Sequence, residues 1–271
     1  MPFARVNGAM LYYREAGEGD LAIFVHGFPL DHSVWLDQIQ GLAHVRRCVA
    51  PDLRGFGRSD PLAEPSLAME SIADDIAGLV AALGCTSADV VGLSMGGYAA
   101  LALCELRPSV VRTLTLVSTR ATPDSAEART AREALADQLV EEGRVVFAGR
   151  MMAALLSPQS SRAMRGRLRS MIEGTRYETM LAALEGMKER PDRSALLPRI
   201  SVPTLVVAGR EDVLTPPSQA RAMADQVPGA RTVVIPGAGH LCPLERPDEV
   251  NSALIELLEG RKVVWWRDGD R

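Results

Sequence analysis

The sequence predicts an α/β fold, in which helices cover both faces of an open, mostly parallel sheet. Short runs rich in β-branched residues alternate with helical patterns along most of the chain. Such runs are typical of strands buried on both faces, and their alternation with helices indicates right-handed crossovers between parallel strands. The 271 residues, 47% of them apolar, are enough for a substantial core.

The expected strands follow one another from the N-terminus. Asn7 and Gly8 form an Asn-Gly pair between two strand-like runs, which predicts a hairpin at the start of the chain. Helical patterns fill most of the intervals between the later strand runs. These runs occupy residues 21–27, 46–52, 88–94, 112–118, 203–209 and 231–237.

Two amphipathic helices have clear boundaries in the sequence. An apolar stripe with helical spacing extends from Ile72 to Leu83 and stops at Gly84. Near the C-terminus, Pro247 occupies a plausible first helical position and Gly260 closes a second stripe. Both helices fit the alternating α/β pattern.

The alternation stops at about Ala121 and resumes after Pro198. Only helical patterns occur between them, and strand runs flank this stretch on both sides. We therefore expect residues 1–120 and 199–271 to form one core, with residues 121–198 inserted as a helical lid. Six of the 11 methionines lie in this lid, where they either pack its helices together or line a pocket.

Ser94 lies at the centre of a Gly-x-Ser-x-Gly pentapeptide between an expected strand and an expected helix. So tight a turn strains its central residue and brings the helix close to the strand, so the neighbouring residues must be small. Gly92, Gly96 and Gly97 meet that need. The pattern predicts a nucleophile elbow that presents the Ser94 hydroxyl above the sheet edge. The alternative is a structural turn with a bystander serine.

A nucleophilic serine needs a base, and the base needs an orienting carboxylate. His240 and Asp212 each come directly after an expected strand, and therefore at the same sheet edge as Ser94. The chain order Ser, Asp, His is the one expected for such a sheet. We predict these three residues as a catalytic triad, with Glu211 as the less favoured acid.

Two backbone N–H groups are predicted to stabilise the oxyanion of an acyl-transfer reaction. The turn at His26 directs the Phe28 N–H toward Ser94, and the Met95 N–H lies beside Ser94 at the start of the helix. Phe28 is also a candidate for the pocket wall. His26 itself is expected to be a buried residue that holds this loop by hydrogen bonds.

Other polar residues are assigned structural roles. His32 and His44 are expected at the surface or in packing, and the arginines of residues 162–169 are expected to be solvated. The segment PDLRGFGRSD is interpreted as a structural turn. Its charged residues, which are able to pair among themselves, are Asp52, Arg54, Arg58 and Asp60.

The segments HGFP, DLRGFGRSD, GLSMGG, GREDVLTP and GAGHLCPLERP occur in the order and spacing typical of the α/β-hydrolase superfamily, which the chain resembles over essentially its full length. The resemblance implies the α/β-hydrolase fold, the triad and oxyanion donors named above, and no cofactor. The chain is most similar to carboxylesterases and 3-oxoadipate enol-lactonases, and less so to cofactor-free haloperoxidases. A serine at position 94 argues against epoxide hydrolases and haloalkane dehalogenases, which carry aspartate there.

We predict a hydrolase that cleaves small-molecule carboxylic esters through an acyl-enzyme. An enol-lactonase is the alternative. A lactone with a free carboxylate would need a cation near the pocket, and Arg120, directly after an expected strand, is the candidate. A ligand receptor with vestigial hydrolysis is the alternative of another class, but Leu93, Gly96 and Gly97 match the enzyme pattern.

The composition of the chain limits the classes of partner and the location that we expect for the protein. A net charge of -4 without a basic block argues against nucleic acid or an anionic membrane surface as partner. No apolar run approaches the ~18 residues of a membrane span, and no secretory signal opens the chain, so a cytoplasmic location is expected. The cysteines have no CxxC pairing, so neither a disulfide framework nor a zinc site is expected. Trp265 and Trp266 either dock on the core or form a contact in a homo-oligomer.

Overall fold

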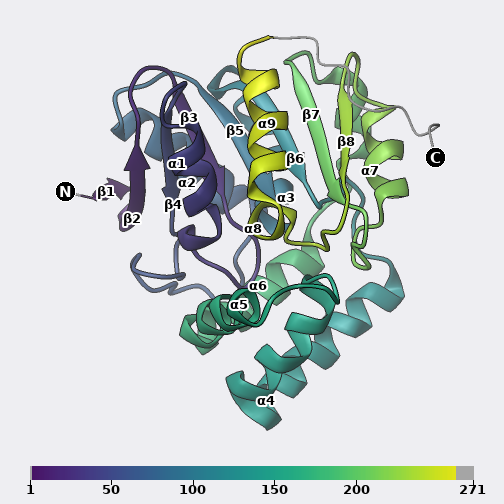
Figure 1. The fold of residues 1–271 in the computed structure, drawn as a ribbon. Coiled ribbons are helices and arrows are strands. Elements are labelled where there is room, and N and C mark those ends of the chain that lie inside the picture. Colours follow the sequence, from purple (N-terminus) through teal and green to yellow (C-terminus); the bar gives the residue numbers. More distant parts are fainter. Residues whose placement is uncertain (1, 261–271) are drawn as a thin grey trace, which may run out of the picture.

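The computed structural model, which describes residues 2–260, contains an eight-stranded sheet with the strand order β1-β2-β4-β3-β5-β6-β7-β8 (Figure 1). β1 and β2 form the hairpin predicted at Asn7 and Gly8, β2 is antiparallel to β4, and the remaining neighbours are parallel. The predicted α/β fold class is thus confirmed. The strands are β1 (Phe3–Val6), β2 (Ala9–Ala16), β3 (Leu21–Val25), β4 (Arg47–Pro51), β5 (Ala88–Leu93), β6 (Val111–Val117), β7 (Thr204–Gly209) and β8 (Arg231–Ile235).

Helices cover both faces of the sheet. Figure 1 shows α1 and α9 in front of the strands and α2 and α3 behind them. α1 packs against α9, α2 packs against α3, and α7 lies on β7 and β8. These helices and the short α8 are α1 (Leu36–Leu42), α2 (Met69–Ala82), α3 (Met95–Leu106), α7 (Pro217–Ala224), α8 (Cys242–Glu245) and α9 (Pro247–Leu258).

The helix boundaries follow the predicted signals. α2 ends just before Gly84, whose φ of +78° is a conformation that glycine adopts without strain. α9 begins at Pro247, and Gly260 with φ +65° lies just beyond its end. Within the described part of the chain, no helix has the length and apolarity that crossing a membrane requires. Trp265 and Trp266 lie outside the described residues.

Between β6 and β7 the described chain is helical, and we call residues 121–198 the helical insertion. α4 is interrupted at Gly143, which has φ 77° and ψ 172°. Figure 1 shows α4, α5 and α6 grouped beyond one end of the strands. The elements of the insertion are α4 (Ala126–Leu155), α5 (Arg162–Gly174), α6 (Tyr177–Glu189) and the 3-10 helix η3 (Ser194–Arg199).

Helix α4 of the insertion packs against α5 and α6, and the insertion also contacts the core. Arg167 of α5 pairs with Asp37 of α1 at 3.0 Å, so this arginine is not simply solvated as the sequence predicts. The buried methionines of the insertion support its packing, as one of the two interpretations of the sequence expects. They are Met152, Met171, Met180 and Met187.

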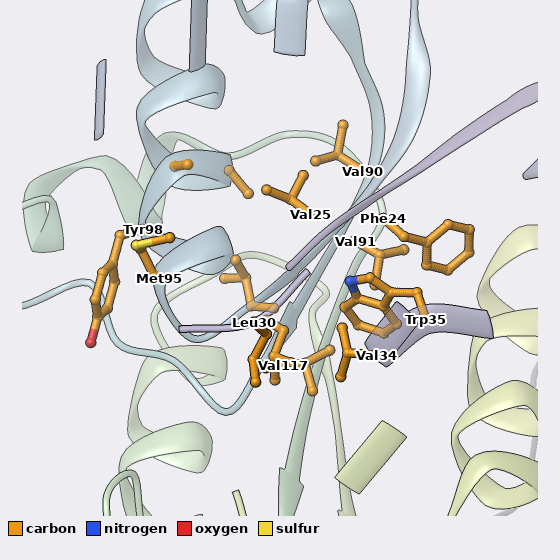
Figure 2. Packing of buried hydrophobic residues seen from close by; sticks show 14 of the residues in the cluster. Phe24, Val25, Leu30, Val34, Trp35, Val90, Val91, Met95, Tyr98 and Val117 are labelled. Carbon is orange, nitrogen blue, oxygen red and sulfur yellow. The ribbon is translucent and has the colours of Figure 1, made fainter. Parts of the chain in front are cut away.

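Bulky apolar side chains fill the layers next to the central strands. Figure 2 shows Met95 and Tyr98 projecting from α3, and Phe24 and Trp35 packed together away from them. The rings of Phe24 and Trp35 lie 5.4 Å apart. The central strand β5 and the helix that follows it are therefore held from both sides.

Candidate active site

Ser94 is the single residue between β5 and α3. Its φ of 53° and ψ of -112° place a non-glycine residue in a strained conformation, as the tight turn predicts. The neighbouring strand compensates for this strain. The Ser94 N–H donates to the Val117 carbonyl at 2.9 Å, and the Ser94 carbonyl accepts from Thr119 Oγ1 at 2.8 Å.

The glycines around Ser94 allow the helix and strand to touch. A Cβ atom on Gly92 would lie 2.4 Å from the Gly96 carbonyl oxygen. A Cβ on Gly96 would lie 2.3 Å from the carbonyl oxygen of Val25 in β3, and one on Gly97 would lie 2.6 Å from the Thr119 side chain. The structure therefore gives each of these positions the steric reason predicted from the sequence.

Ser94 lies at the point where the strand order of the sheet reverses direction. The chain passes from β3 to β4 on one side and then to β5 on the other side of β3. In open α/β sheets, the crevice at the carboxyl ends of such strands is where ligands bind. Gly27, which follows β3, lies against this point, since a Cβ there would be 3.2 Å from Ser94 Cβ.

Asp212 and His240 are brought together at the ends of β7 and β8. His240 Nδ1 lies 2.9 Å from Asp212 Oδ2, and both side chains are buried. Because a carboxylate accepts this hydrogen bond, the hydrogen resides on Nδ1 and Nε2 is left as an acceptor. This is the tautomer that a general base for serine needs.

Asp212 is held as a carboxylate by its neighbours. Its Oδ1 accepts from the N–H groups of Leu214 and Thr215, each at 2.9 Å, and Oδ2 accepts from Thr215 Oγ1 at 2.6 Å. Burial alone would raise the pKa of Asp212. The hydrogen bonds from His240 and Thr215 outweigh that effect and keep the pKa below its usual range.

Thr215 was not among the residues predicted from the sequence, which also left Glu211 open as the acid. Thr215 Oγ1 lies 3.3 Å from His240 Nδ1 and joins Asp212 to the histidine loop. The available signal was the threonine three residues after the aspartate, a spacing that allows a local side-chain hydrogen bond. Glu211 accepts a hydrogen bond from Ser157 Oγ, so its carboxylate is engaged with the helical insertion while Asp212 pairs with His240.

Phe28 and Met95 both offer N–H groups at this edge. Met95 is the first residue of α3, so its N–H has no intrahelical acceptor. Among residues 2–260, no acceptor is found for either N–H. The Phe28 ring packs edge to face on Phe147 of α4, with ring centroids 6.3 Å apart, which brings the insertion to the Phe28 loop.

His26 has the structural role predicted for it. The buried ring accepts from the Leu53 N–H through Nε2 at 3.1 Å, so its Nδ1 carries the hydrogen and donates to the Gly27 carbonyl at 2.9 Å. Burial lowers the pKa of His26, which keeps the ring neutral. His26 thus ties the Phe28 loop to the segment after β4.

In the described part of the chain, the charged side chains of the PDLRGFGRSD turn form no ion pair with one another, although the sequence would allow such pairs. Asp52 accepts from His32 Nδ1 at 2.7 Å and from the Arg58 backbone N–H at 2.8 Å. Arg54 instead forms an ion pair with Asp75 of α2. Asp52 is structural, as expected, and it joins the turn, through the Arg58 N–H, to His32 of a different segment.

One group of described side chains is spaced as the ligands of a metal ion could be. Potential ligand atoms of Asp31, His32 and Asp52 all lie within 4.8 Å of one another. Their atoms already serve the turn, since Asp31 accepts from the Ser33 N–H at 2.8 Å and Asp52 accepts from His32. Hydrogen bonds of the turn therefore account for this group.

Arg120 follows β6, but its contacts lead toward α7. Its Nη2 donates to the Leu214 carbonyl at 3.1 Å. Its side chain lines a cavity of about 130 Å³ with Gln219 and Met223 of α7, among other residues. That cavity has no wall residue in common with the predicted triad or oxyanion donors. The structure thus connects Arg120 to the acid loop through Leu214 rather than to Ser94 directly.

Comparisons with known proteins agree with this architecture. Residues 22–247 match the family model of the alpha/beta hydrolase fold. The solved structure of a thermophilic esterase from Thermogutta terrifontis, with malate bound, is 38% identical, covers 95% of this chain and 97% of its own, and has a TM-score of 0.90.

Two other proteins show the range of activities among similar chains. The enol-lactonase from Burkholderia xenovorans LB400 is 28% identical, with 95% of this chain and 100% of that chain covered and a TM-score of 0.87. The pimeloyl-(acyl-carrier protein) methyl ester esterase of Chromobacterium violaceum is 33% identical over 92% of this chain and 98% of its own length. The chain described here belongs to the alpha/beta hydrolase family.

Proposed function

We propose that this hydrolase cleaves carboxylic esters through an acyl-enzyme formed on Ser94. The observation that carries the proposal is the buried hydrogen bond between His240 Nδ1 and Asp212, 2.9 Å long, at the sheet edge that holds the strained Ser94. A hydroxyl, a correctly tautomerised imidazole and a fixed carboxylate are the parts of a nucleophilic triad. Similarity to esterases from Thermogutta terrifontis and Chromobacterium violaceum also supports it.

In the acylation half, Ser94 Oγ attacks the ester carbonyl carbon while His240 Nε2 takes the hydroxyl proton. Asp212 stabilises the imidazolium that forms, and the N–H groups of Phe28 and Met95 bind the oxyanion. The tetrahedral intermediate collapses as His240 donates its proton to the leaving alcohol. The acyl group remains on Ser94.

In the deacylation half, water replaces the alcohol. His240 takes a proton from the water as its oxygen attacks the acyl carbonyl, and the same two N–H groups bind the second oxyanion. Collapse releases the carboxylic acid, and His240 returns the proton to Ser94 Oγ. The net reaction consumes one water and needs no redox partner.

Replacement of the nucleophile tests the proposal. We expect Ser94→Ala to lower kcat on short p-nitrophenyl esters by about 10⁴-fold or more, because the acyl-enzyme can no longer form. Initial rates measured with purified wild type and variant give the comparison. Ser170→Ala, which removes an exposed hydroxyl of α5, is the control and should leave the rate unchanged. Ester turnover that survives in Ser94→Ala would remove Ser94 from the mechanism.

Enol-lactone hydrolysis is the second candidate, favoured by the similarity to the Burkholderia enol-lactonase. Because the Arg120 guanidinium binds the Leu214 carbonyl, we expect it to contribute little to a lactone carboxylate. We therefore expect kcat/KM for the enol-lactone to be no higher than for the best ester, and to change less than about threefold in Arg120→Ala. A strong lactone preference that Arg120→Ala abolishes would instead establish the lactonase.

A further inference from the structure

The end of α4 and the connection from α4 to α5, residues 156–161, lie directly on the loop that carries His240. The Leu241 N–H donates to the Leu155 carbonyl at 3.2 Å. A Cβ on Gly239 would lie 2.7 Å from the Ser157 nitrogen, so the two backbones are in contact there. The residues before and after His240 are thus both held by the helical insertion.

Glu245 joins these two segments through a buried carboxylate that is 7% exposed. Its Oε2 accepts from the Gly239 N–H at 2.7 Å. Its Oε1 accepts from the Ser157 N–H at 2.8 Å and from Ser160 Oγ at 2.5 Å. One side chain therefore fixes the residue next to His240 to the α4–α5 connection.

The same connection reaches the loop of the acid. Ser157 Oγ donates to Glu211, the residue before Asp212, and the Glu211 N–H donates to the Ala238 carbonyl at 2.9 Å. Ser157 is 1% exposed, so water does not compete for these bonds. Glu245, Ser157 and Glu211 form a continuous path that links the backbones on which His240 and Asp212 lie.

Hydrogen bonds of a buried carboxylate are strong because the acceptor is charged and the surroundings have a low dielectric constant. The Gly239 N–H has Glu245 as its acceptor, and a glycine lacks the side chain that would otherwise hold the loop by packing. The backbone position of His240, and with it the direction of its ring, therefore depends on Glu245. An error of about 1 Å in such a position can lower a rate by about 100-fold.

We propose that Glu245 is a positioning residue for His240, acting with Ser157 and Ser160 of the helical insertion. The proposal rests on the proposed function, in which His240 is the base for Ser94. Glu245 touches neither Asp212 nor the reacting atoms in the contacts described, and it acts through the Gly239 backbone. A purely structural carboxylate would affect folding but not the chemical step.

Glu245→Gln tests this proposal because it keeps the shape of the side chain. An amide has one acceptor oxygen, so its NH₂ group must face either the Gly239 N–H or the Ser157 N–H, and a buried donor loses its acceptor. We expect kcat on a p-nitrophenyl ester to fall by about 10- to 100-fold with KM within about twofold of wild type. We also expect the downfield proton resonance of the His240–Asp212 hydrogen bond to shift or broaden.

Glu249→Gln is the matched control, because it makes the same chemical change at an exposed position in the first turn of α9. It should leave kcat and the resonance unchanged. A folded Glu245→Gln protein with wild-type kcat and an unshifted resonance would overturn the proposal. If Glu245→Gln does not fold, Ser160→Ala decides instead, since it removes one hydrogen bond: a fall in kcat of about two- to tenfold is expected, and an unchanged kcat overturns the proposal.

The failure of the proposed function has a different signature. In that case wild type and Ser94→Ala would cleave esters equally, or neither would cleave them. The downfield resonance of the wild type and of Glu245→Gln then decides the positioning role alone. A resonance that is the same in both proteins would overturn it.

Discussion

At the scale of single residues, Ser94 shows how local strain is retained in a folded chain. A serine with φ 53° costs on the order of 1–3 kcal/mol, and the conformation persists only if its neighbours fix it. Here Val117 and Thr119 bind the Ser94 backbone, and the adjacent glycines let α3 approach β5. The strained residue immediately precedes the helix start, where the Met95 N–H lies.

Gly92→Ala tests this close approach. The added methyl group would lie 2.4 Å from the Gly96 carbonyl oxygen, which is backbone and has little freedom to move away. We expect the free energy of unfolding to fall by about 3 kcal/mol, together with a loss of ester hydrolysis, because the elbow must shift. Urea denaturation followed by circular dichroism measures the first effect.

Gly149→Ala is the control for that substitution. Gly149 lies in α4, is exposed, and would have no atom within 4 Å of its Cβ. The same change should there raise the free energy of unfolding by about 0.5–1 kcal/mol, because alanine favours helices. Equal stability losses in the two variants would contradict the steric argument.

Residue roles were predictable from the sequence where a local turn, or the shared edge at which parallel strands end, brings the residues together. The glycines around Ser94 and the hydrogen-bonding role of His26 follow from a turn between consecutive elements. Asp52 and Arg54 belong to a group of charged residues that are close in sequence and able to pair, yet their side chains bind His32 and Asp75. Such partners depend on how distant segments meet, which no local pattern reports.

At the scale of elements, the core was more predictable than the helical insertion. Each predicted strand run coincides with an observed strand to within two residues at either end. Strands buried on both faces must be apolar throughout, so their signal is strong. For the insertion, the sequence indicated helices but gave neither their bounds nor the kink at Gly143.

The contacts that attach the insertion to the core could not be predicted from the sequence either. Buried Arg190 pairs with Asp124 at 2.8 Å and lies 4.1 Å above the ring of Tyr98 in α3. Arg167 binds Asp37 in α1. Because arginine is common on helix surfaces, its number in the insertion did not distinguish solvated side chains from those that join elements.

At the scale of the whole molecule, buried ionisable groups predict how stability depends on pH. Burial lowers the pKa of His26, so the unfolded chain takes up this proton first, near its ordinary pKa of about 6.5. For Asp52 and Asp124, burial would raise the pKa, but hydrogen bonds and opposite charges outweigh it and lower the pKa. Their unfolded pKa is about 3.9.

For all of these groups stability decreases as the pH falls, since the unfolded state binds more protons in acid. The contribution of His26 is complete above about pH 6.5 and is lost as the pH falls toward the pKa of the folded protein. That of the aspartates is complete above about pH 4 and is lost as the pH falls further. Urea midpoints measured from pH 8 to pH 3 should therefore decrease in two steps.

Two variants assign the steps. His26→Gln should flatten the upper step, and Asp52→Asn should flatten the lower one while lowering stability at pH 7. A single loss of stability confined to the lower range in the wild-type protein would contradict the role given to His26.

The contact of Ser157 with Glu245 and Glu211 has a consequence for protein engineering and for evolution. Seen along the sequence, the insertion is a cassette between β6 and β7 that recombination could exchange between relatives to change the substrate. Because its middle is bonded to two loops that follow β7 and β8, a chimaera would have to inherit both partners of each contact. New specificities should therefore arise more readily from substitutions within the insertion than from its replacement.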